Sequence, residues 1–305
     1  DIVRRNARRY PQQTAVVCGT ARLSFAELNR RTNSLANALI GLGLQPAEKV
    51  AILLDNCHQY IELYFAIPKA GGIAVPLNTA LTPPEMAYII NNAAVKLLVF
   101  GERFAATVNS LLPQLGSVKT LVVVGSPVMG ASSYEPLVAQ YPAIEPEVKA
   151  TEQDIVYLLY TSGTTGLPKG IMVTHRSLIE SALNYVLGCQ LKHHDVGLVA
   201  TPLFWAASIE PNFLPQFYAG GRVVIADTFT PEAILSLIQQ EKVTTGLLTP
   251  PMIIAILEHP QLGNYNLTSL RHIWFGGVLM PVKTLEKAIK TLGNIFFQCY
   301  GLVEC

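Results

Sequence analysis

The stretch DIVYLLYTSGTTGLPKGIMVT, residues 154–174, places a loop rich in hydroxyl groups and glycine between two apolar runs. The flanking runs 154–160 and 170–174 have the continuous apolar character of buried β-strands. Glycines allow the loop backbone to turn its N–H groups inward, the hydroxyls add donors, and Lys169 supplies a positive charge. This combination is typical of a loop that binds a polyphosphate.

Two other kinds of loop fit the sequence less well. A P-loop of the GxxxxGK[ST] type is excluded because Pro168 stands where the second glycine is required and Gly170 follows Lys169. The run after the loop also resembles a strand, whereas a P-loop opens a helix. An ordinary hairpin turn is disfavoured because it needs about two to five residues and neither a set of hydroxyl groups nor a lysine.

Similar apolar runs alternate with helical patterns along most of the chain. The predicted strands are 14–18, 49–54, 73–77, 96–100, 120–124, 154–160, 170–174, 222–226, 244–248, 272–275 and 294–298. Their continuous apolar character predicts parallel sheets covered on both faces, so we expect an α/β fold of two doubly wound, mainly parallel βαβ lobes. Pro, Ser, Gly and Glu concentrate at 126–153, which places the first lobe at 1–150 and the second, with the loop, at 151–305.

Three helix starts are marked by capping residues. Thr82 before Pro83 and Thr230 before Pro231 each offer an N-cap side chain followed by proline in the first turn. Ser24 and Glu27 have the spacing of a capping box at the start of a long amphipathic helix.

The composition narrows the class of protein. The 305 residues are 50% hydrophobic and 14% charged with a formal net charge of +1, a balance that favours a globular chain and gives no indication of a nucleic acid partner. The apolar runs are too short for an integral membrane span, and the basic N-terminus has no apolar stretch of a secretory signal after it. The five scattered cysteines predict reduced thiols and a cytoplasmic location.

The loop and the segments around it resemble one known superfamily. YTSGTTGLPKGIMVTH is similar to the signature loop of adenylate-forming enzymes, which include acyl- and aryl-CoA synthetases, luciferases and peptide-synthetase adenylation domains. Further similar segments follow in the family's order: LSFAELNRRTNSLANAL, KAGGIAVPLN, TPLFW, FGGVLMP and the final YGLVE. The resemblance extends over essentially the whole chain and corresponds to the N-terminal part of these enzymes.

The resemblance implies an ATP-dependent ligase that activates a carboxylic acid as an acyl adenylate and transfers it to CoA, with Mg²⁺ as the metal. It assigns Lys169 and Glu304 to catalysis, with Glu304 as the Mg²⁺ ligand. It assigns to ATP binding Thr161, Ser162, Gly163, Thr164, Thr165, Gly166, Lys169, Gly276, Gly277, Val278, Tyr300 and Gly301. Tyr300 would stack on the adenine, although an aromatic residue after a strand is often simply part of the core.

The pocket for the acid is assigned less directly. The resemblance points to Trp205, Ala206, Ser208 and Gly277. Trp205 stands where many acyl-CoA synthetases carry histidine, and it either walls the pocket or packs in the core. His175, His193 and His194 are interpreted as capping or solvated groups.

Two departures from the family pattern bear on activity. Val303 replaces the threonine of YGxTE, which removes a hydroxyl from the phosphate end of the site. The family's hinge and C-terminal domain have no counterpart in these residues, so we expect an N-terminal fragment with little activity by itself. A domain that loads a carrier protein, and a catalytically silent nucleotide- or acyl-binding module, remain alternatives. A homo-oligomer also stays open.

Overall fold

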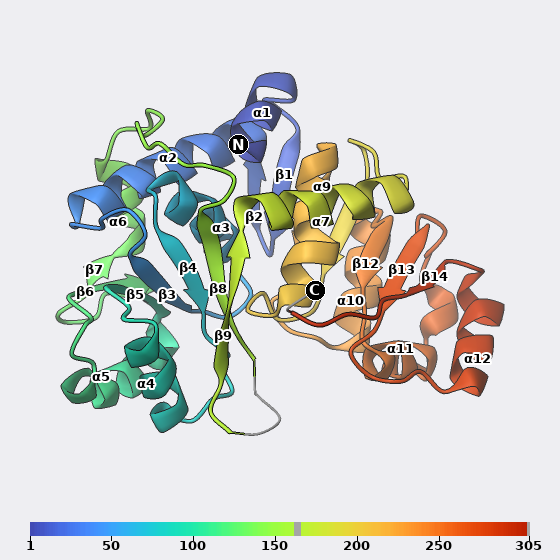
Figure 1. The fold of residues 1–305 in the computed structure, drawn as a ribbon. Helices are drawn as coiled ribbons and strands as arrows, with labels where there is room; N and C mark the ends of the chain where they lie inside the picture. Colours follow the sequence, from blue (N-terminus) through green and yellow to red (C-terminus); the bar gives the residue numbers. More distant parts are fainter. Residues whose placement is uncertain (162–165, 304–305) are drawn as a thin grey trace. The chain divides into compact units, whose positions relative to one another are not determined.

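The computed structural model describes residues 1–161 and 166–303, which divide into two compact units. Unit 1 comprises Asp1–Phe25 and Glu180–Cys305, and unit 2 comprises Ala26–Ile179 (Figure 1). Each unit is built around its own seven-stranded, mainly parallel sheet. The predicted α/β fold with two mainly parallel lobes is confirmed.

The division of the chain differs from the predicted boundary at residue 150. Strand β1 (Thr14–Cys18) pairs in parallel with β11 (Arg222–Ile225), which draws the first residues of the chain into unit 1. Strand β8 (Ile155–Thr161) pairs with β4 (Ile73–Pro76), which draws the signature hairpin into unit 2. Composition identifies an exposed connection, but it does not show which sheet a strand joins.

Unit 2 holds a sheet of order β7-β6-β5-β3-β4-β8-β9, in which β8 and β9 are antiparallel. Its remaining helices and strands are α2 (Phe25–Gly41), β3 (Lys49–Leu53), α3 (His58–Lys69), α4 (Pro83–Asn92), β5 (Leu97–Gly101), η1 (Glu102–Phe104), α5 (Ala105–Leu111), η2 (Leu112–Gln114), β6 (Thr120–Val124), β7 (Ser132–Ser133), α6 (Tyr134–Gln140) and β9 (Lys169–Thr174).

Helices cover both faces of this sheet. On one face, Leu98 and Phe100 of β5 pack in a cluster with side chains of α4 and α5, which lie together beside the strands in Figure 1. On the other, the ring of Tyr157 on β8 lies 5.0 Å from that of Tyr64 on α3. Adjacent strand residues point to opposite faces, so Leu158 joins this cluster while Tyr157 contacts Tyr64 on the other face.

Unit 1 holds a sheet of order β14-β13-β12-β10-β11-β1-β2, in which β1 and β2 are antiparallel. Its other elements are α1 (Ile2–Arg9), β2 (Ala21–Ser24), β10 (Val196–Val199), α8 (Ala206–Ser208), the π-helix η3 (Ile209–Phe213), α9 (Leu214–Ala219), α10 (Pro231–Glu241), β12 (Thr245–Leu247), α11 (Pro250–Leu257), η4 (Leu262–Asn264), β13 (His272–Phe275), α12 (Val282–Leu292) and β14 (Phe296–Gln298). Helix α7 (His175–Gly188) runs from unit 2 into unit 1.

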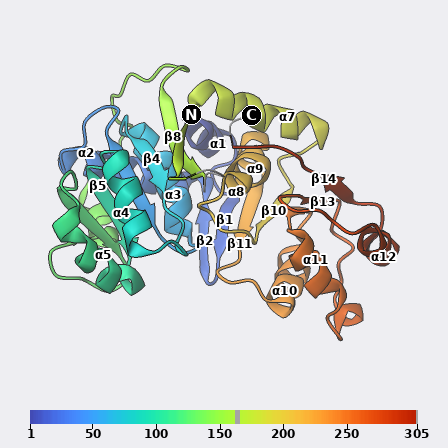
Figure 2. The ribbon, with the colours of Figure 1, turned by 60° about the horizontal axis from the view of Figure 1, so that its bottom comes forward.

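The core of unit 1 is also layered. Leu198 and Ile273 face a cluster made with α10 and α11, which lie side by side in both ribbon views (Figure 2). Trp274, next to Ile273 on β13, points to the opposite face and packs with Cys189 at the end of α7. None of the helices in residues 1–161 and 166–303 combines the length and hydropathy that a membrane span needs.

Two of the predicted helix starts have N-cap hydrogen bonds in the structure. Helix α4 begins with a capping box in which Glu85 accepts hydrogen bonds from the backbone and the hydroxyl of Thr82. Helix α10 begins with the Thr230 hydroxyl accepting from the N–H of Ala233. Both N-caps are therefore confirmed.

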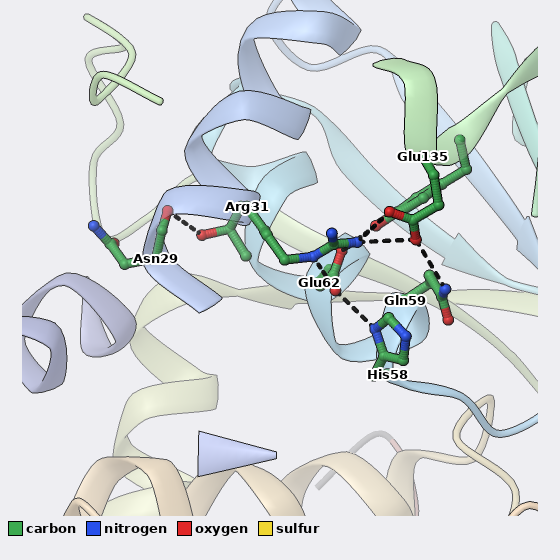
Figure 3. Close-up of polar contacts among 8 residues, drawn as sticks. Asn29, Arg31, His58, Gln59, Glu62 and Glu135 are labelled. Atoms are coloured by element: carbon green, nitrogen blue, oxygen red, sulfur yellow. Dashed lines mark hydrogen bonds and ion pairs between the residues drawn. The ribbon is translucent and has the colours of Figure 1, made fainter. Parts of the chain in front are cut away.

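Glu62 on α3 is the buried centre of an ion-pair network in unit 2 (Figure 3). Its carboxylate accepts from Arg31 on α2 at 2.8 and 3.0 Å, lies 2.9 Å from His58 Nδ1, and accepts from the Tyr134 hydroxyl at 2.7 Å. Arg31 also reaches Glu135 at 3.0 Å, so the network joins α2, α3 and α6. Burial alone would raise the pKa of Glu62, but the hydrogen bonds from His58 and Arg31 hold it below its usual value.

Replacing Arg31 tests how much unit 2 depends on this network. We expect Arg31→Met to lower the free energy of unfolding by about 3–5 kcal/mol, because it leaves the Glu62 carboxylate buried without its arginine. The depressed pKa of Glu62 gives a stabilisation that is present above the unfolded-state pKa of about 4.3 and is lost as pH falls through the folded-state pKa. Urea unfolding should therefore show the two proteins converging below about pH 4.

The matched control is Arg103→Met, which removes an ion pair with Asp55 whose side chains are 59% and 48% exposed. This surface pair should contribute less than about 1 kcal/mol. Equal losses in the two variants at pH 7 would contradict a special role for the buried network.

Candidate functional site

The signature loop joins two antiparallel strands. On β8 and β9, Tyr160 lies opposite Gly170 and Thr161 lies opposite Lys169. The connection is thus a long hairpin, followed by a strand as predicted and not by the helix that a P-loop requires. Of the predicted phosphate-binding residues, Ser162, Gly163, Thr164 and Thr165 lie outside the described residues.

The base of the hairpin lies at an edge suited to ligands. Strand β8 runs parallel to β4, so Thr161 stands at the carboxyl edge of the sheet, where open α/β sheets bind ligands. Lys169 is exposed directly opposite Thr161. Gly166 has φ of +152°, a backbone conformation that other residues rarely adopt.

Packing fixes the strand pair beneath this loop. A Cβ atom at Gly170 would lie 3.0 Å from Cζ of Tyr160, so the backbone of β9 rests against that ring. The Tyr160 hydroxyl donates to Oδ1 of Asn92 on α4 at 2.6 Å. Burial raises the pKa of Tyr160 to about 12, which keeps the hydroxyl protonated as a donor near neutral pH.

In unit 1, the predicted residues follow three strands of one parallel sheet. Trp205 follows β10, Gly276 to Val278 follow β13, and Tyr300 with Gly301 follows β14. These strands run in parallel through β12, so their carboxyl ends share an edge of the sheet. The sheet thus brings residues far apart in the sequence to the same edge of unit 1.

Two glycines determine the backbone at this edge. A Cβ atom at Gly276 would lie 2.5 Å from the carbonyl oxygen of Cys299, so a side chain cannot fit between the ends of β13 and β14. The N–H of Cys299 donates to the carbonyl of Phe275 at 2.8 Å and holds the two ends together. Gly277 has φ of +81°, in the left-handed region.

Tyr300 is 96% exposed, so within unit 1 it is not a core side chain and its ring faces are open. Val278, which follows β13, and Gly301, which follows β14, are exposed as well. Glu304, the predicted Mg²⁺ ligand, lies outside the described residues. Residues 1–161 and 166–303 contain no group of three or more His, Cys, Asp or Glu side chains arranged to hold a metal ion.

The segment predicted to line the acid pocket forms a tight turn after β10. Trp205 is 41% exposed and Ala206 is half-buried, but Ser208 is buried. The Ser208 hydroxyl donates to the carbonyl of Pro202 at 2.7 Å and lies 2.6 Å from Oγ1 of Thr201. The Ser208 hydroxyl therefore makes its hydrogen bonds within the turn that carries Trp205 and Ala206.

Glu210, which was not predicted from the sequence, lies two residues after Ser208 and is half-buried on η3. Ser181 and Tyr185, which lie on α7 near Glu210, were not predicted either. In the sequence Glu210 is one carboxylate in an apolar, proline-rich stretch, and such a residue is usually solvated. The position of this carboxylate inside a largely apolar run was the feature of the sequence that could have identified Glu210.

Each unit by itself offers groups suited to part of a nucleotide. In unit 2, Thr161 and Lys169 offer a hydroxyl and a positive charge at a sheet edge, as phosphates require. In unit 1, the exposed ring of Tyr300 offers a flat surface of the kind on which a purine base stacks.

Comparisons with known proteins agree with the predicted superfamily. The chain is 35% identical to a feruloyl-CoA synthase of an Amycolatopsis species over 98% of its own length, and it spans 58% of that relative. Among solved structures, it matches the anthranilate CoA ligase AuaEII in complex with anthranoyl-AMP with a TM-score of 0.92 and 27% identity, covering 97% of this chain and 58% of that one. It matches the N-terminal domain of FACL13 from Mycobacterium tuberculosis with a TM-score of 0.92 and 26% identity, covering 99% of this chain and 75% of that one.

The predicted resemblance to adenylate-forming enzymes is therefore confirmed. The model of the AMP-binding enzyme family matches residues 3–305, and the chain belongs to that family.

Proposed function

We propose that this chain is the ATP- and acid-binding part of an AMP-forming carboxylic acid–CoA ligase. The observation that carries the proposal is the β8–β9 hairpin, which sets Lys169 opposite Thr161 at the carboxyl edge of a parallel sheet. A flexible cation beside hydroxyl and backbone donors suits the phosphates of ATP.

The proposed reaction has two steps. The carboxylate of the acid attacks the α-phosphorus of ATP, the bond to the β-phosphate oxygen breaks, and pyrophosphate leaves with the electron pair. The sulfur of CoA then attacks the acyl carbon and AMP leaves. Lys169 would neutralise charge on the departing pyrophosphate, and Glu304 would hold Mg²⁺, an ion that prefers oxygen ligands.

The acid is proposed to be aromatic. Trp205 is partly exposed after β10 and offers a flat apolar surface to a ring. The names of a 35% identical feruloyl-CoA synthase and of the anthranilate CoA ligase support this class of acid. We infer a cytoplasmic setting, where ATP and CoA are available.

ATP–pyrophosphate exchange by the complete gene product tests the first step. Aromatic acids should support exchange more strongly than fatty acids of similar size, and CoA should then release AMP. A protein that binds ATP but exchanges with no acid in the panel would sink the ligase proposal.

Lys169→Ala tests the assignment of the hairpin. Loss of one charge-assisted contact of about 1.5–3 kcal/mol should weaken ATP binding about 10- to 100-fold in calorimetric titration. Lys287→Ala, which removes an exposed lysine on α12, is the matched control and should leave the affinity unchanged. Equal affinities in the two variants would count against a phosphate contact at Lys169.

Gly276→Ala tests the edge of unit 1. The added methyl group meets the Cys299 carbonyl, so the ends of β13 and β14 must separate, at a cost of about 1–3 kcal/mol in folding free energy. Weaker nucleotide binding and a lower melting temperature should appear together. Gly263→Ala is the control because a Cβ atom there meets nothing within 4 Å; similar behaviour of both variants would contradict the close approach.

A further inference from the structure

Glu210 places a carboxyl group in an unusual position in unit 1. It lies on the π-helix η3, which continues directly from the turn that presents Trp205 and Ala206. Segments of π-helix are uncommon and occur frequently at functional sites. Neighbouring residues Ile209 and Pro211 are buried, so the glutamate emerges from an apolar surface.

The carboxyl group has little to balance its charge. Its hydrogen bond from the Ser181 hydroxyl is long, at 3.4 Å to Oε2. Among the described residues, no lysine, arginine or histidine forms an ion pair with it. Burial raises the pKa of Glu210, and the bond from Ser181 offsets this only in part.

Contacts of Tyr185 connect this carboxyl group with the edge that carries the predicted adenine-binding residues. Tyr185 and Cys299 each influence the pKa of the other, so the two side chains are close, and the Tyr185 ring lies 6.3 Å from that of Trp274. The charge of Glu210 contributes to the raised pKa of Tyr185, after burial and the influence of Cys299, so the two groups are near each other. Cys299 in turn touches Gly276 and directly precedes Tyr300.

A half-buried carboxyl group without a cation costs folding free energy, because water solvates it poorly and no protein charge compensates. Such a group is retained most readily where a ligand supplies the missing partner. A donor on the ligand would satisfy the carboxyl oxygens that Ser181 leaves free.

We propose that Glu210, with Ser181 and Tyr185, forms the polar end of the acid pocket and selects carboxylic acids that carry a hydroxyl or amino group remote from the carboxylate. The inference rests on the proposed ligase function and deepens it by naming the substrate class. Glu210 acts by binding this substituent and takes no part in the transfer of the acyl group.

The experiment uses matched pairs of acids with the complete gene product. Cinnamic and 4-hydroxycinnamic acids form one pair, and benzoic and aminobenzoic acids form another. The wild-type protein should favour the substituted acid of each pair in kcat/KM for ATP–pyrophosphate exchange. In Glu210→Leu that preference should fall by about 10- to 100-fold, as expected when a hydrogen bond to a charged group is lost.

Glu210→Gln keeps the shape of the side chain and guards against a folding defect in the leucine variant. It should retain part of the preference for hydroxyl substituents and lose more of the preference for amino substituents. Glu258→Gln, an exposed glutamate on the same unit, should leave every ratio unchanged. Thermal melting of each variant confirms that it is folded.

Binding of the same acids, measured by calorimetry, separates the two proposals. If no acid supports exchange but substituted acids still bind more tightly and lose that advantage in Glu210→Gln, the ligase proposal fails and the pocket assignment stands. If exchange occurs and the ratios for wild type, Glu210→Leu and Glu210→Gln coincide, the assignment of Glu210 is overturned. A wild-type preference for the unsubstituted acid of each pair overturns it as well.

Discussion

Parallel pairing carries β10, β12, β13 and β14 toward the same edge of the unit 1 sheet, so the residues that follow these strands gather there. At β10 the order of the strands reverses, because β11 lies on one side of it and β12, the next strand in the chain, on the other. Ligands of open α/β sheets bind at such a switch point. Trp205 and Glu210 both follow β10, so the segment that we propose to contact the acid lies at a position where such sheets bind ligands.

The strands of this fold were predictable where an apolar run is bounded by polar or turn residues, as for 120–124 and 272–275, which match β6 and β13. Strand β10 was missed because Val196–Val199 is short and passes directly into Ala200, with no polar or turn residue at its end. The unit boundary was also misplaced. Membership of a sheet depends on pairing between distant strands, which composition does not report.

Some residues of the candidate site could likewise be assigned from the sequence, and others could not. Lys169 and Gly276 were assigned from the order of the family motifs, and their contacts with ATP stay predictions. The structure places Lys169 exposed opposite Thr161 and Gly276 against the Cys299 carbonyl. Ser208 was assigned to the acid pocket, yet its hydroxyl is used by the turn itself. Glu210 was not found, since its distinguishing property is a tertiary one: partial burial without a cation.

Two glutamates of this chain lie in contrasting environments. Glu62 is fully buried but receives Arg31, His58 and Tyr134, and its pKa is lowered. Glu210 is less buried but receives only a long bond from a serine hydroxyl, and its pKa is raised. Burial of a carboxylate is unfavourable for folding at both positions. Only at Glu62 do ion pairs and hydrogen bonds within the chain offset this unfavourable free energy. If folding alone governed the choice of residue 210, an apolar side chain would serve better, because Ile209, Pro211 and Phe213 of the same helix are buried. This contrast supports the proposal that the partner of the Glu210 carboxyl group arrives with the substrate.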